Sequence, residues 1–451
     1  MLLTIEKLIY GGDGLARLTA NDEGRGKAVF VPFVLAGEQI DASFVEQKPG
    51  FARAAANRIV EPSAHRVAAE CRYFQQCGGC HYQHASYEYQ LEIKKEILRE
   101  TLRRTAKLEL NREIKVHPSP PWNYRNRSRL QVQTQPEFVL GYFRMGSHQL
   151  LAVEECPISS LLINRAIAAL WKQGRAGKVP AGVREVEFFA NADDSQLLIE
   201  LGCGAEVRRA GIREWAEELR AEMKETAGVV AFRQVGGDGS SKGKKRSDSP
   251  ASPFQHSVER FLTVGDEFLI YQTERAAYRV SAGSFFQTNR FLTDELVKIV
   301  AEAQSGDPAS RDLALDLYAG VGLFSTALAG DFRHIVSVEP SQTSSADLAY
   351  NRQANGEGVA ATTEQYLAGA DLPQIPDLVV VDPPRSGLGE RVARQLGHLG
   401  APRVVYVSCD PATLARDLVI LLGAGYRVEQ VHLVDLFPQT FHLESVVHLT
   451  R

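Results

Sequence analysis

Long apolar stretches are missing from this sequence of 451 residues. No run of 18 apolar residues occurs, which excludes a conventional membrane-spanning helix, and no signal peptide opens the chain. We therefore expect a cytoplasmic protein with no membrane partner. Cysteine is also scarce, because the six in the chain are too few for a disulfide scaffold of this size. Three of them lie within ten residues, and such clustering in a cytoplasmic protein indicates a metal site.

A strong excess of charge is lacking as well. The net charge of −4 does not by itself indicate a nucleic-acid-binding protein. The balance hides an asymmetry, since residues 1–130 hold 20 Lys and Arg against 15 Asp and Glu, whereas the remainder holds 31 against 40. A positive first part on an acidic remainder is compatible with an N-terminal contact to nucleic acid on an enzyme. The length predicts two to four domains, and the apolar content of 44% is ordinary for a globular protein.

Residues 1–62 are predicted to form a small β-barrel domain. Short apolar and β-branched runs are separated by turn signals such as Gly11-Gly12-Asp13-Gly14 and Ala36-Gly37. Barrels of this kind often present basic residues to RNA, although a β module without nucleic acid fits the same pattern. The expected strands are Leu2–Leu8, Lys27–Val34, Glu38–Val45 and Arg53–Val60.

A cysteine cluster follows the predicted barrel. Cys71, Cys77 and Cys80 are spaced by five and two residues, and Gly78-Gly79 allows the backbone to wrap tightly around a metal. Cys156-Pro157 lies far downstream and offers a fourth thiol. Four thiolates suit either tetrahedral zinc or a four-iron cluster, and the spacing does not separate these two. Unrelated free thiols remain the alternative.

We expect residues 63–275 to form a central α+β domain that contains this cysteine loop. Its first helix is predicted at 86–106, where one stripe is apolar and the other positions are charged. Strands are expected over 138–156, 183–203 and 227–234, with helices near 158–174 and 204–224.

Basic residues mark two further features of this central region. Arg125, Arg127 and Arg129 stand at alternate positions just before the predicted strand Leu130–Thr134, so they form either a phosphate-binding face or a solvated one. The segment 236–253 is low in complexity and rich in Gly, Ser and Lys, and we expect a mobile insertion there. Its lysine cluster is better explained by solvent exposure than by RNA contact.

Strand–helix alternation begins near residue 280 and predicts a doubly wound parallel sheet over residues 276–451. The fold class is therefore α/β for this C-terminal domain. Ligands in such sheets bind at the carboxyl ends of the strands. The expected strands are Ala314–Tyr318, His334–Glu339, Leu378–Asp382 and Val404–Ser408.

A nucleotide-type pocket is predicted at the first two of these strand ends. Asp316-Leu-Tyr-Ala-Gly-Val-Gly322 closes one strand with two glycines, which let a ligand approach the backbone closely. Glu339 ends the next strand, where a carboxylate accepts hydrogen bonds from both ribose hydroxyls of an adenosine cofactor. A third glycine of the pyrophosphate fingerprint is missing, so a cofactor without phosphates, S-adenosylmethionine, fits better. A structural turn with a solvated Glu is the alternative.

Reactive groups follow the remaining strands. Cys409 lies where a strand passes into a helix, so it is either a small buried apolar residue or a nucleophile whose pKa is lowered by the helix N-terminus. Asp382 ends the neighbouring strand in a loop that two prolines stiffen. His442 and Glu444 stand at alternate positions, hence on one strand face, and either is a candidate base or half of a structural polar pair.

These motifs together resemble the RNA (uracil-5-)methyltransferases over nearly the whole chain. The front end resembles the TRAM domain and the four-cysteine segment, with its 4Fe-4S cluster, that are typical of the 23S ribosomal RNA branch. The motifs that carry the resemblance are, in chain order, Asp316–Gly322, Asp382-Pro-Pro-Arg385, Ser408-Cys-Asp-Pro411 and Thr440-x-His442-x-Glu444.

The resemblance assigns roles to individual residues. It makes Cys409 the nucleophile that adds to uracil C6, and Glu444 the base that removes the C5 proton. The contacts to S-adenosyl-L-methionine would be Gln287, Tyr318, Glu339 and Asp382. The 4Fe-4S cluster ligands would be Cys71, Cys77, Cys80 and Cys156.

The expected function is therefore methylation of uracil C5 in RNA, with ribosomal RNA favoured over transfer RNA as the partner. No obligate protein partner is evident in the sequence. A transfer RNA enzyme of the same chemistry is one alternative. A non-catalytic RNA-binding factor for ribosome assembly is another, although the presence of both Cys409 and Glu444 argues against it.

Overall fold

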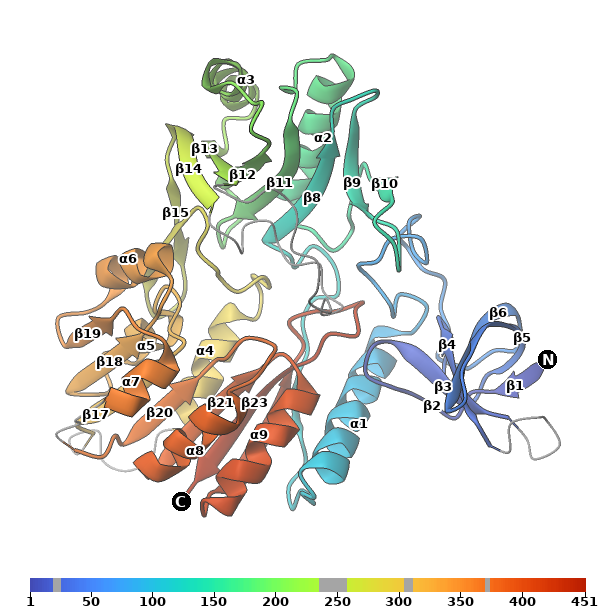
Figure 1. Cartoon of the computed structure of the whole chain (residues 1–451), viewed down its shortest axis with the longest axis vertical. Helices are drawn as coiled ribbons and strands as arrows, with labels where there is room; N and C mark the ends of the chain where they lie inside the picture. Colours follow the sequence, from blue (N-terminus) through green and yellow to red (C-terminus); the bar gives the residue numbers. More distant parts are fainter. Residues whose placement is uncertain (19–25, 235–257, 304–310, 370–373) are drawn as a thin grey trace.

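The computed structural model describes residues 1–18, 26–234, 258–303, 311–369 and 374–451, and the predicted insertion at 236–253 lies outside them. The first unit is a curved sheet with strand order β1-β5-β6-β4-β3-β2 (Figure 1). Its end strands, β1 and β2, are two halves of the segment Leu2–Leu8, so this segment joins the opposite ends of the sheet. The strand bounds are β1 (Leu2–Thr4), β2 (Lys7–Leu8), β3 (Asp13–Arg17), β4 (Ala28–Pro32), β5 (Gln39–Gln47) and β6 (Phe51–Glu61).

The central unit is a mixed sheet with strand order β10-β9-β8-β11-β12-β13-β14 and two helices packed on it. Trp171 of α2 and Trp215 of α3 share one apolar core with the inward side chains of these strands. The bounds are β8 (Arg127–Gln133), β9 (Val139–Phe143), β10 (Leu150–Ala152), α2 (Leu161–Arg175), β11 (Val183–Ala190), β12 (Leu197–Cys203), α3 (Arg209–Glu222), β13 (Thr226–Gln234) and β14 (Val258–Gly265).

The C-terminal unit has strand order β19-β18-β17-β20-β21-β23-β22-β7. The first five strands in this order, β19, β18, β17, β20 and β21, run parallel. Strand β23 lies between β21 and β22 and is antiparallel to both. The small hairpin β15 (Phe268–Gln272) and β16 (Ala277–Ser281) precedes it. The other bounds are α4 (Thr293–Glu302), β17 (Leu313–Leu317), α5 (Leu323–Leu328), β18 (His334–Val338), α6 (Gln342–Asn351), β19 (Gly356–Val359), α7 (Thr363–Gly369), β20 (Leu378–Val381), α8 (Gly389–Leu399), β21 (Arg403–Ser408), α9 (Pro411–Gly423), β22 (Arg427–Val434) and β23 (Glu444–Thr450).

Two elements from earlier in the chain complete this C-terminal unit. Strand β7 (Lys115–His117) pairs in parallel with β22 at the end of the sheet. Helix α1 (Tyr87–Thr105) packs beside α9, and its Ile93, Ile97 and Leu98 belong to the same apolar core as the sheet (Figure 1). The unit that carries the predicted catalytic residues is therefore built partly from residues 87–117.

The sequence left two interpretations of the alternating arginines open, a phosphate-binding face or a solvated one, and the buried Arg127 fits neither. Arg127 and Arg129 do not form a phosphate-binding face, because their guanidinium groups pair with carboxylates inside the sheet. Arg127 is buried and contacts Glu187 and Glu200, while Arg129 pairs with Glu185 and Glu187. Alternation of charge along a strand predicted which side chains share a face, but their acidic partners lie on β11 and β12, far away in sequence.

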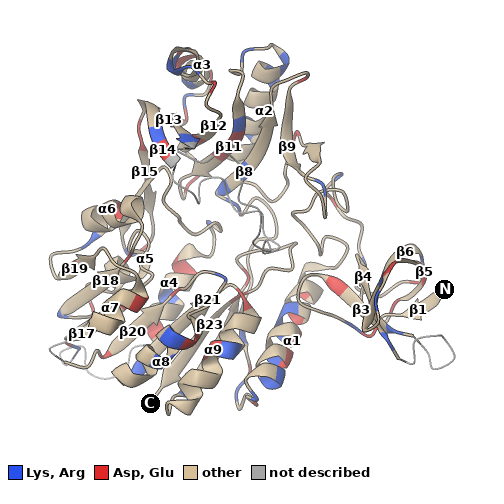
Figure 2. Cartoon of the chain, viewed as in Figure 1, with Lys and Arg blue, Asp and Glu red and all other residues tan. Residues whose placement is uncertain are grey.

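Lys and Arg residues are spread over the N-terminal, central and C-terminal units in Figure 2, with several along α1.

None of the described helices combines the length and the apolar character needed to cross a lipid bilayer.

Candidate active site

The predicted site residues gather at one edge of the C-terminal sheet. Tyr318, Glu339, Asp382 and Cys409 are each the first residue after a parallel strand, namely β17, β18, β20 and β21. Glu444 begins β23, which runs antiparallel to β21, so its first residue lies at the same edge. Ser445 pairs directly with Ser408. The sheet thus brings together five residues that are up to 126 positions apart in sequence.

A glycine loop forms one side of this edge. Gly320 and Gly322 have φ of 57° and 89°, and Tyr318 itself has φ of 68°, a conformation that few residues other than glycine adopt. The carboxylate of Glu339 accepts hydrogen bonds from the backbone N–H of Gly320 at 3.0 Å and of Ser341 at 2.8 Å. These bonds fix the carboxylate against the loop and leave its other lone pairs available to a ligand.

Three carboxyl groups lie near one another behind this loop. Burial raises the pKa of Asp382 to about 7, and the neighbouring Asp316 carboxylate adds to the shift. Burial likewise raises the pKa of Asp316 to about 6, although a hydrogen bond from the Ser325 amide opposes it. The pKa of Glu444 is also raised, first by burial and then by Asp382, while Arg385 opposes. A buried cluster of like charges favours binding of a cation.

The environment of Cys409 contradicts a lowered pKa, one of the two alternatives that the sequence left open. Burial raises the pKa of its thiol to about 12, and the carboxylates of Glu444 and Asp382 add to the increase. The helix N-terminus does not compensate, because Asp410 accepts the hydrogen bonds of the first free amides, those of Ala412 and Thr413. With this raised pKa, the thiol is protonated at neutral pH.

The sequence suggested that His442 and Glu444 share one strand face. This is wrong, because His442 lies just before β23 rather than on it. A guanidinium nitrogen of Arg385 lies 3.3 Å from its Nδ1. The pKa of His442 is lowered well below its usual value, first by burial and then by Arg385. A neutral imidazole held by a cation is a poor proton acceptor, which leaves Glu444 as the better candidate base.

The loop between β22 and β23 is anchored by residues from the first third of the chain. Three consecutive carbonyl oxygens accept hydrogen bonds there. Phe437 O accepts from Lys94 Nζ at 2.9 Å. Pro438 O accepts from the Tyr124 hydroxyl at 3.0 Å. Gln439 O accepts from the amides of His81 and Tyr82, both at 2.9 Å. This anchoring fixes the approach of the chain to Glu444.

Helix α1 supplies two buried polar residues to this anchor, and the sequence did not point to them. Gln90 and Gln439 exchange a pair of hydrogen bonds of 2.9 Å, which supports the φ of 68° at Gln439. Lys94 and Asp435 form a fully buried ion pair at 2.6 Å. Two polar residues four positions apart on the buried side of an amphipathic helix are the signal that could have identified them.

Gln287, the last predicted cofactor contact, is buried in the segment between β16 and α4. The start of that segment is held from the central unit. Glu200 accepts a hydrogen bond from the Gly283 amide at 2.9 Å, and Arg127 donates to the Ser284 carbonyl. The buried Arg127 thus supports the segment that carries Gln287.

The four predicted cluster ligands lie near one another in the loop before α1 and after β10. Burial is the main cause of raised pKa values at Cys71, Cys77 and Cys80, and Cys156 raises all three further. The burial and the donor type suit a metal that prefers thiolates. Across the part of the chain that the structure describes, however, no group of three or more His, Cys, Asp or Glu side chains is arranged to hold a metal ion.

Comparison with known proteins identifies the family. The sequence matches the family described as tRNA (Uracil-5-)-methyltransferase over residues 86–360 and 365–451. The chain belongs to the tRNA (uracil-5-)-methyltransferase family. A protein of Aquifex aeolicus (strain VF5), named as an uncharacterized RNA methyltransferase, is 32% identical over 453 residues and covers 99% of this chain and 97% of its own. A similarly named protein of Listeria monocytogenes serotype 4b (strain F2365) is 30% identical over 470 residues, with coverage of 99% and 96%.

A solved structure extends this identification of the methyltransferase to its fold. The Pyrococcus abyssi tRNA (uracil-54, C5)-methyltransferase in complex with S-adenosyl-L-homocysteine matches with a TM-score of 0.73, 25% identity and coverage of 100% of both chains. The predicted α/β methyltransferase fold is confirmed. The protein is an RNA (uracil-5-)methyltransferase.

Proposed function

We propose that this methyltransferase modifies uracil C5 through a covalent bond between Cys409 and uracil C6. The proximity of Cys409 and Glu444 at one sheet edge supports this most directly, because Ser408 and Ser445 are paired neighbours on adjacent strands. Uracil C5 is a weak nucleophile, so a second group must raise its electron density before it can accept a methyl group. A thiol that adds to C6 from one side of the ring raises the electron density at C5. A base on the other side then removes the C5 proton.

In the proposed reaction the Cys409 thiolate adds to C6, the C5=C6 double bond opens, and its electrons form an enolate. C5 then attacks the methyl carbon of S-adenosyl-L-methionine, the bond from sulfur to methyl breaks, and the sulfur keeps the electron pair and leaves as S-adenosyl-L-homocysteine. Glu444 removes the C5 proton, the double bond re-forms, and the thiolate leaves. Before addition, the Cys409 thiol loses its proton to solvent, and Glu444 must be ionised before it accepts the C5 proton. Arg385 is the nearby cation that lowers the pKa of both Cys409 and Glu444.

We further propose that Glu339 binds the ribose of the donor and that Gln287, Tyr318 and Asp382 complete its site. The glycine loop with two positive φ angles offers the close backbone approach that a nucleoside requires. The buried carboxyl groups of Asp316 and Asp382 supply the negative potential that a sulfonium cation favours.

For the substrate we propose 23S ribosomal RNA, bound partly by residues 1–62 as a TRAM-type unit. The cysteine loop and this N-terminal unit support the ribosomal branch, as the sequence motifs suggested. Transfer RNA is the second candidate, because the Pyrococcus abyssi structure that matches over the full length of both chains is a transfer RNA enzyme. A uridine in a helix must be extruded to reach the strand edge, at a cost of a few kcal/mol.

We also propose that Cys71, Cys77, Cys80 and Cys156 hold a 4Fe-4S cluster. The support is the donor set of four half-buried thiols. The pKa values of Cys71, Cys77 and Cys80 are raised first by burial and further by Cys156, so the fourth thiol lies near the other three. Its role would be structural, since the amide of His81, next to Cys80, bonds to the Gln439 carbonyl of the anchored loop. Iron and sulfide analysis with absorbance near 400 nm tests this in an anaerobic preparation, and a colourless, zinc-loaded protein contradicts it.

The experiment that tests the proposed reaction uses 5-fluorouridine in RNA together with S-adenosyl-L-methionine. Fluorine replaces the C5 hydrogen, and a base cannot remove it as it removes a proton, so the thiolate cannot be expelled. The enzyme should therefore remain attached to the RNA through Cys409 after denaturation. Cys409→Ala should form no adduct. Mass spectrometry of transcribed 23S ribosomal RNA and transfer RNA after incubation then separates the two substrates. Wild-type protein that methylates RNA without any adduct would overturn the covalent route.

A further inference from the structure

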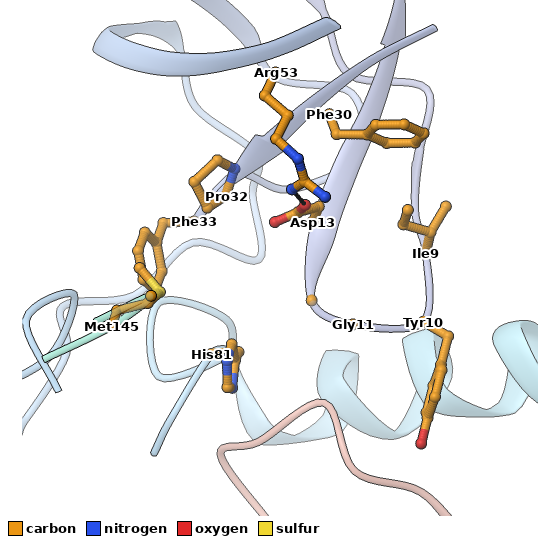
Figure 3. Close-up of a pocket in the computed structure, with 12 residues that line it drawn as sticks. Ile9, Tyr10, Gly11, Asp13, Phe30, Pro32, Phe33, Arg53, His81 and Met145 are labelled. Carbon is orange, nitrogen blue, oxygen red and sulfur yellow. Dashed lines mark hydrogen bonds and ion pairs between the residues drawn. The ribbon is translucent and has the colours of Figure 1, made fainter. Parts of the chain in front are cut away.

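A cavity of about 550 Å³ lies between the N-terminal sheet and the cysteine loop (Figure 3). One wall is the N-terminal unit, which contributes the turn before β3 and residues of β4 and β6. The other wall comes from the segment after Cys80 and from the turn that follows β9. The side chains that matter for its chemistry are Tyr10, Asp13, Phe30, Phe33, Arg53 and His81.

This cavity is adjacent to the catalytic edge. The Tyr10 hydroxyl donates to the backbone carbonyl of Cys409 at 3.3 Å. Tyr10 and His81 also pack against Phe441, with ring centroids 5.5 Å and 4.6 Å away. Phe441 is three residues before Glu444. A substrate strand that places one nucleotide at Cys409 can therefore place a neighbouring nucleotide in this cavity.

The chemistry of the walls favours a flat, neutral ring with polar edges. Phe30 and Phe33 are half-buried and offer apolar faces. The cation in the cavity, Arg53, is paired with Asp13 at 3.2 Å, so the pair has little net charge to attract a phosphate. Together the pair offers both donors and an acceptor to the edge of a ring. The Nδ1 atom of His81 is buried and has no hydrogen-bond partner among the described residues.

We infer that this cavity binds one nucleobase of the RNA substrate, at a position close to the uridine that enters the catalytic site. The inference rests on the proposed function, because it takes the uridine at Cys409 as the neighbouring group. The cavity volume is sufficient for a nucleobase and part of its ribose. Base stacking on aromatic rings is tolerant of sequence, so the cavity fixes the path of the strand rather than reading one base. Tyr10 is then shared between the flanking base and the nucleophile's backbone.

The test uses a fluorescein-labelled RNA nonamer of adenosines with one central uridine, and a series in which one flanking base at a time is removed. Dissociation constants are measured by fluorescence anisotropy for wild type, Phe30→Ala and Arg53→Gln. Phe44→Ala on β5 and Arg58→Gln on β6 are matched controls, because both residues are exposed on the same sheet and outside the cavity. Thermal unfolding shows whether each variant keeps its fold.

We expect one flanking position at which loss of the base weakens binding to wild type on the order of ten-fold. Phe30→Ala should bind the intact RNA weakly and should lose sensitivity at that position, while both controls should keep the sensitivity of wild type there, whatever their affinity for the intact RNA. Equal sensitivity in wild type and Phe30→Ala overturns the inference, as does failure of wild type to bind the nonamer. If Phe30→Ala unfolds, Arg53→Gln decides by the same comparison.

Failure of the proposed function gives a different pattern. In that case the flanking-base effect persists, but 5-fluorouridine RNA forms no adduct with Cys409. If the adduct forms and no flanking position depends on Phe30 or Arg53, the reaction stands and the cavity inference is wrong.

Discussion

The affinity for S-adenosyl-L-methionine should depend on pH in a way that the demethylated product does not share. The pKa of Asp382 is raised to about 7 by burial and by Asp316. A sulfonium cation near this carboxyl group favours its ionised form, so donor binding and proton loss are coupled. Below this pKa the Asp382 carboxyl group is neutral, so Asp382 must release its proton when the donor binds, and binding is weaker.

The magnitude follows from the fraction of ionised Asp382. Asp382 is ionised in about ten of eleven molecules at pH 8 and in about one of eleven at pH 6. The dissociation constant of S-adenosyl-L-methionine should therefore rise about ten-fold as the pH falls from 8 to 6. S-adenosyl-L-homocysteine lacks the sulfonium charge and should show a much flatter profile. Isothermal titration calorimetry at several pH values, in buffers of different ionisation enthalpy, measures both the affinity and the protons released.

Two variants make this prediction specific. Asp382→Asn should bind the donor weakly at every pH and should lose most of the pH dependence. Asp312→Asn is the matched control, because Asp312 lies at the amino end of β17, opposite the site, and pairs with Arg333. A flat profile for the donor in wild type, or an equal slope for the donor and its product, would refute the role of the buried carboxyl groups.

Three further outcomes follow from the site. Glu444→Gln should speed the reaction of Cys409 with iodoacetamide at pH 8 several-fold, because Glu444 is the carboxylate that most raises the thiol pKa; an unchanged rate contradicts this. Lys94→Met should destabilise the protein by about 3–5 kcal/mol in urea unfolding, because it leaves Asp435 buried without its cation. The double variant with Asp435→Asn should recover part of that loss, and a cost below about 1 kcal/mol for Lys94→Met would show that the pair is not structural. Gln90→Ala should lower kcat more than it raises the dissociation constant of the methyl donor, because it loosens Gln439 rather than the glycine loop; equal effects on both contradict the anchoring role.

The sequence predicted the parallel strands of the C-terminal sheet closely. The expected strand Ala314–Tyr318 corresponds to β17 at Leu313–Leu317, and the helix expected at 86–106 is α1. These elements carry strong local patterns, and ligands of open α/β sheets bind at strand ends, so the positions of Tyr318, Glu339, Asp382 and Cys409 followed from local signals alone.

What the sequence missed depends on contacts between distant segments. Strand β7 has three residues and no recognisable pattern, and it is a strand because β22 offers it a free edge. Lys94 is buried because Asp435, 341 positions later, neutralises it. For Cys409 the sequence left open a small buried residue or a thiol with a lowered pKa, and the pKa is raised. The helix N-terminus is visible in the sequence, whereas capping by Asp410 and the nearby carboxylates depend on folded geometry.

The position of β23 has a consequence for how the enzyme becomes competent. This strand follows both β21 and β22 in the chain, yet it lies between them in the sheet. The two earlier strands therefore cannot complete the sheet with each other, and a gap must stay open until β23 enters it. Glu444 is the first residue of the strand that fills this gap. Nucleophile and base are thus neighbours only when β23 is in place between β21 and β22, so completion of the sheet and assembly of the catalytic pair depend on the same strand.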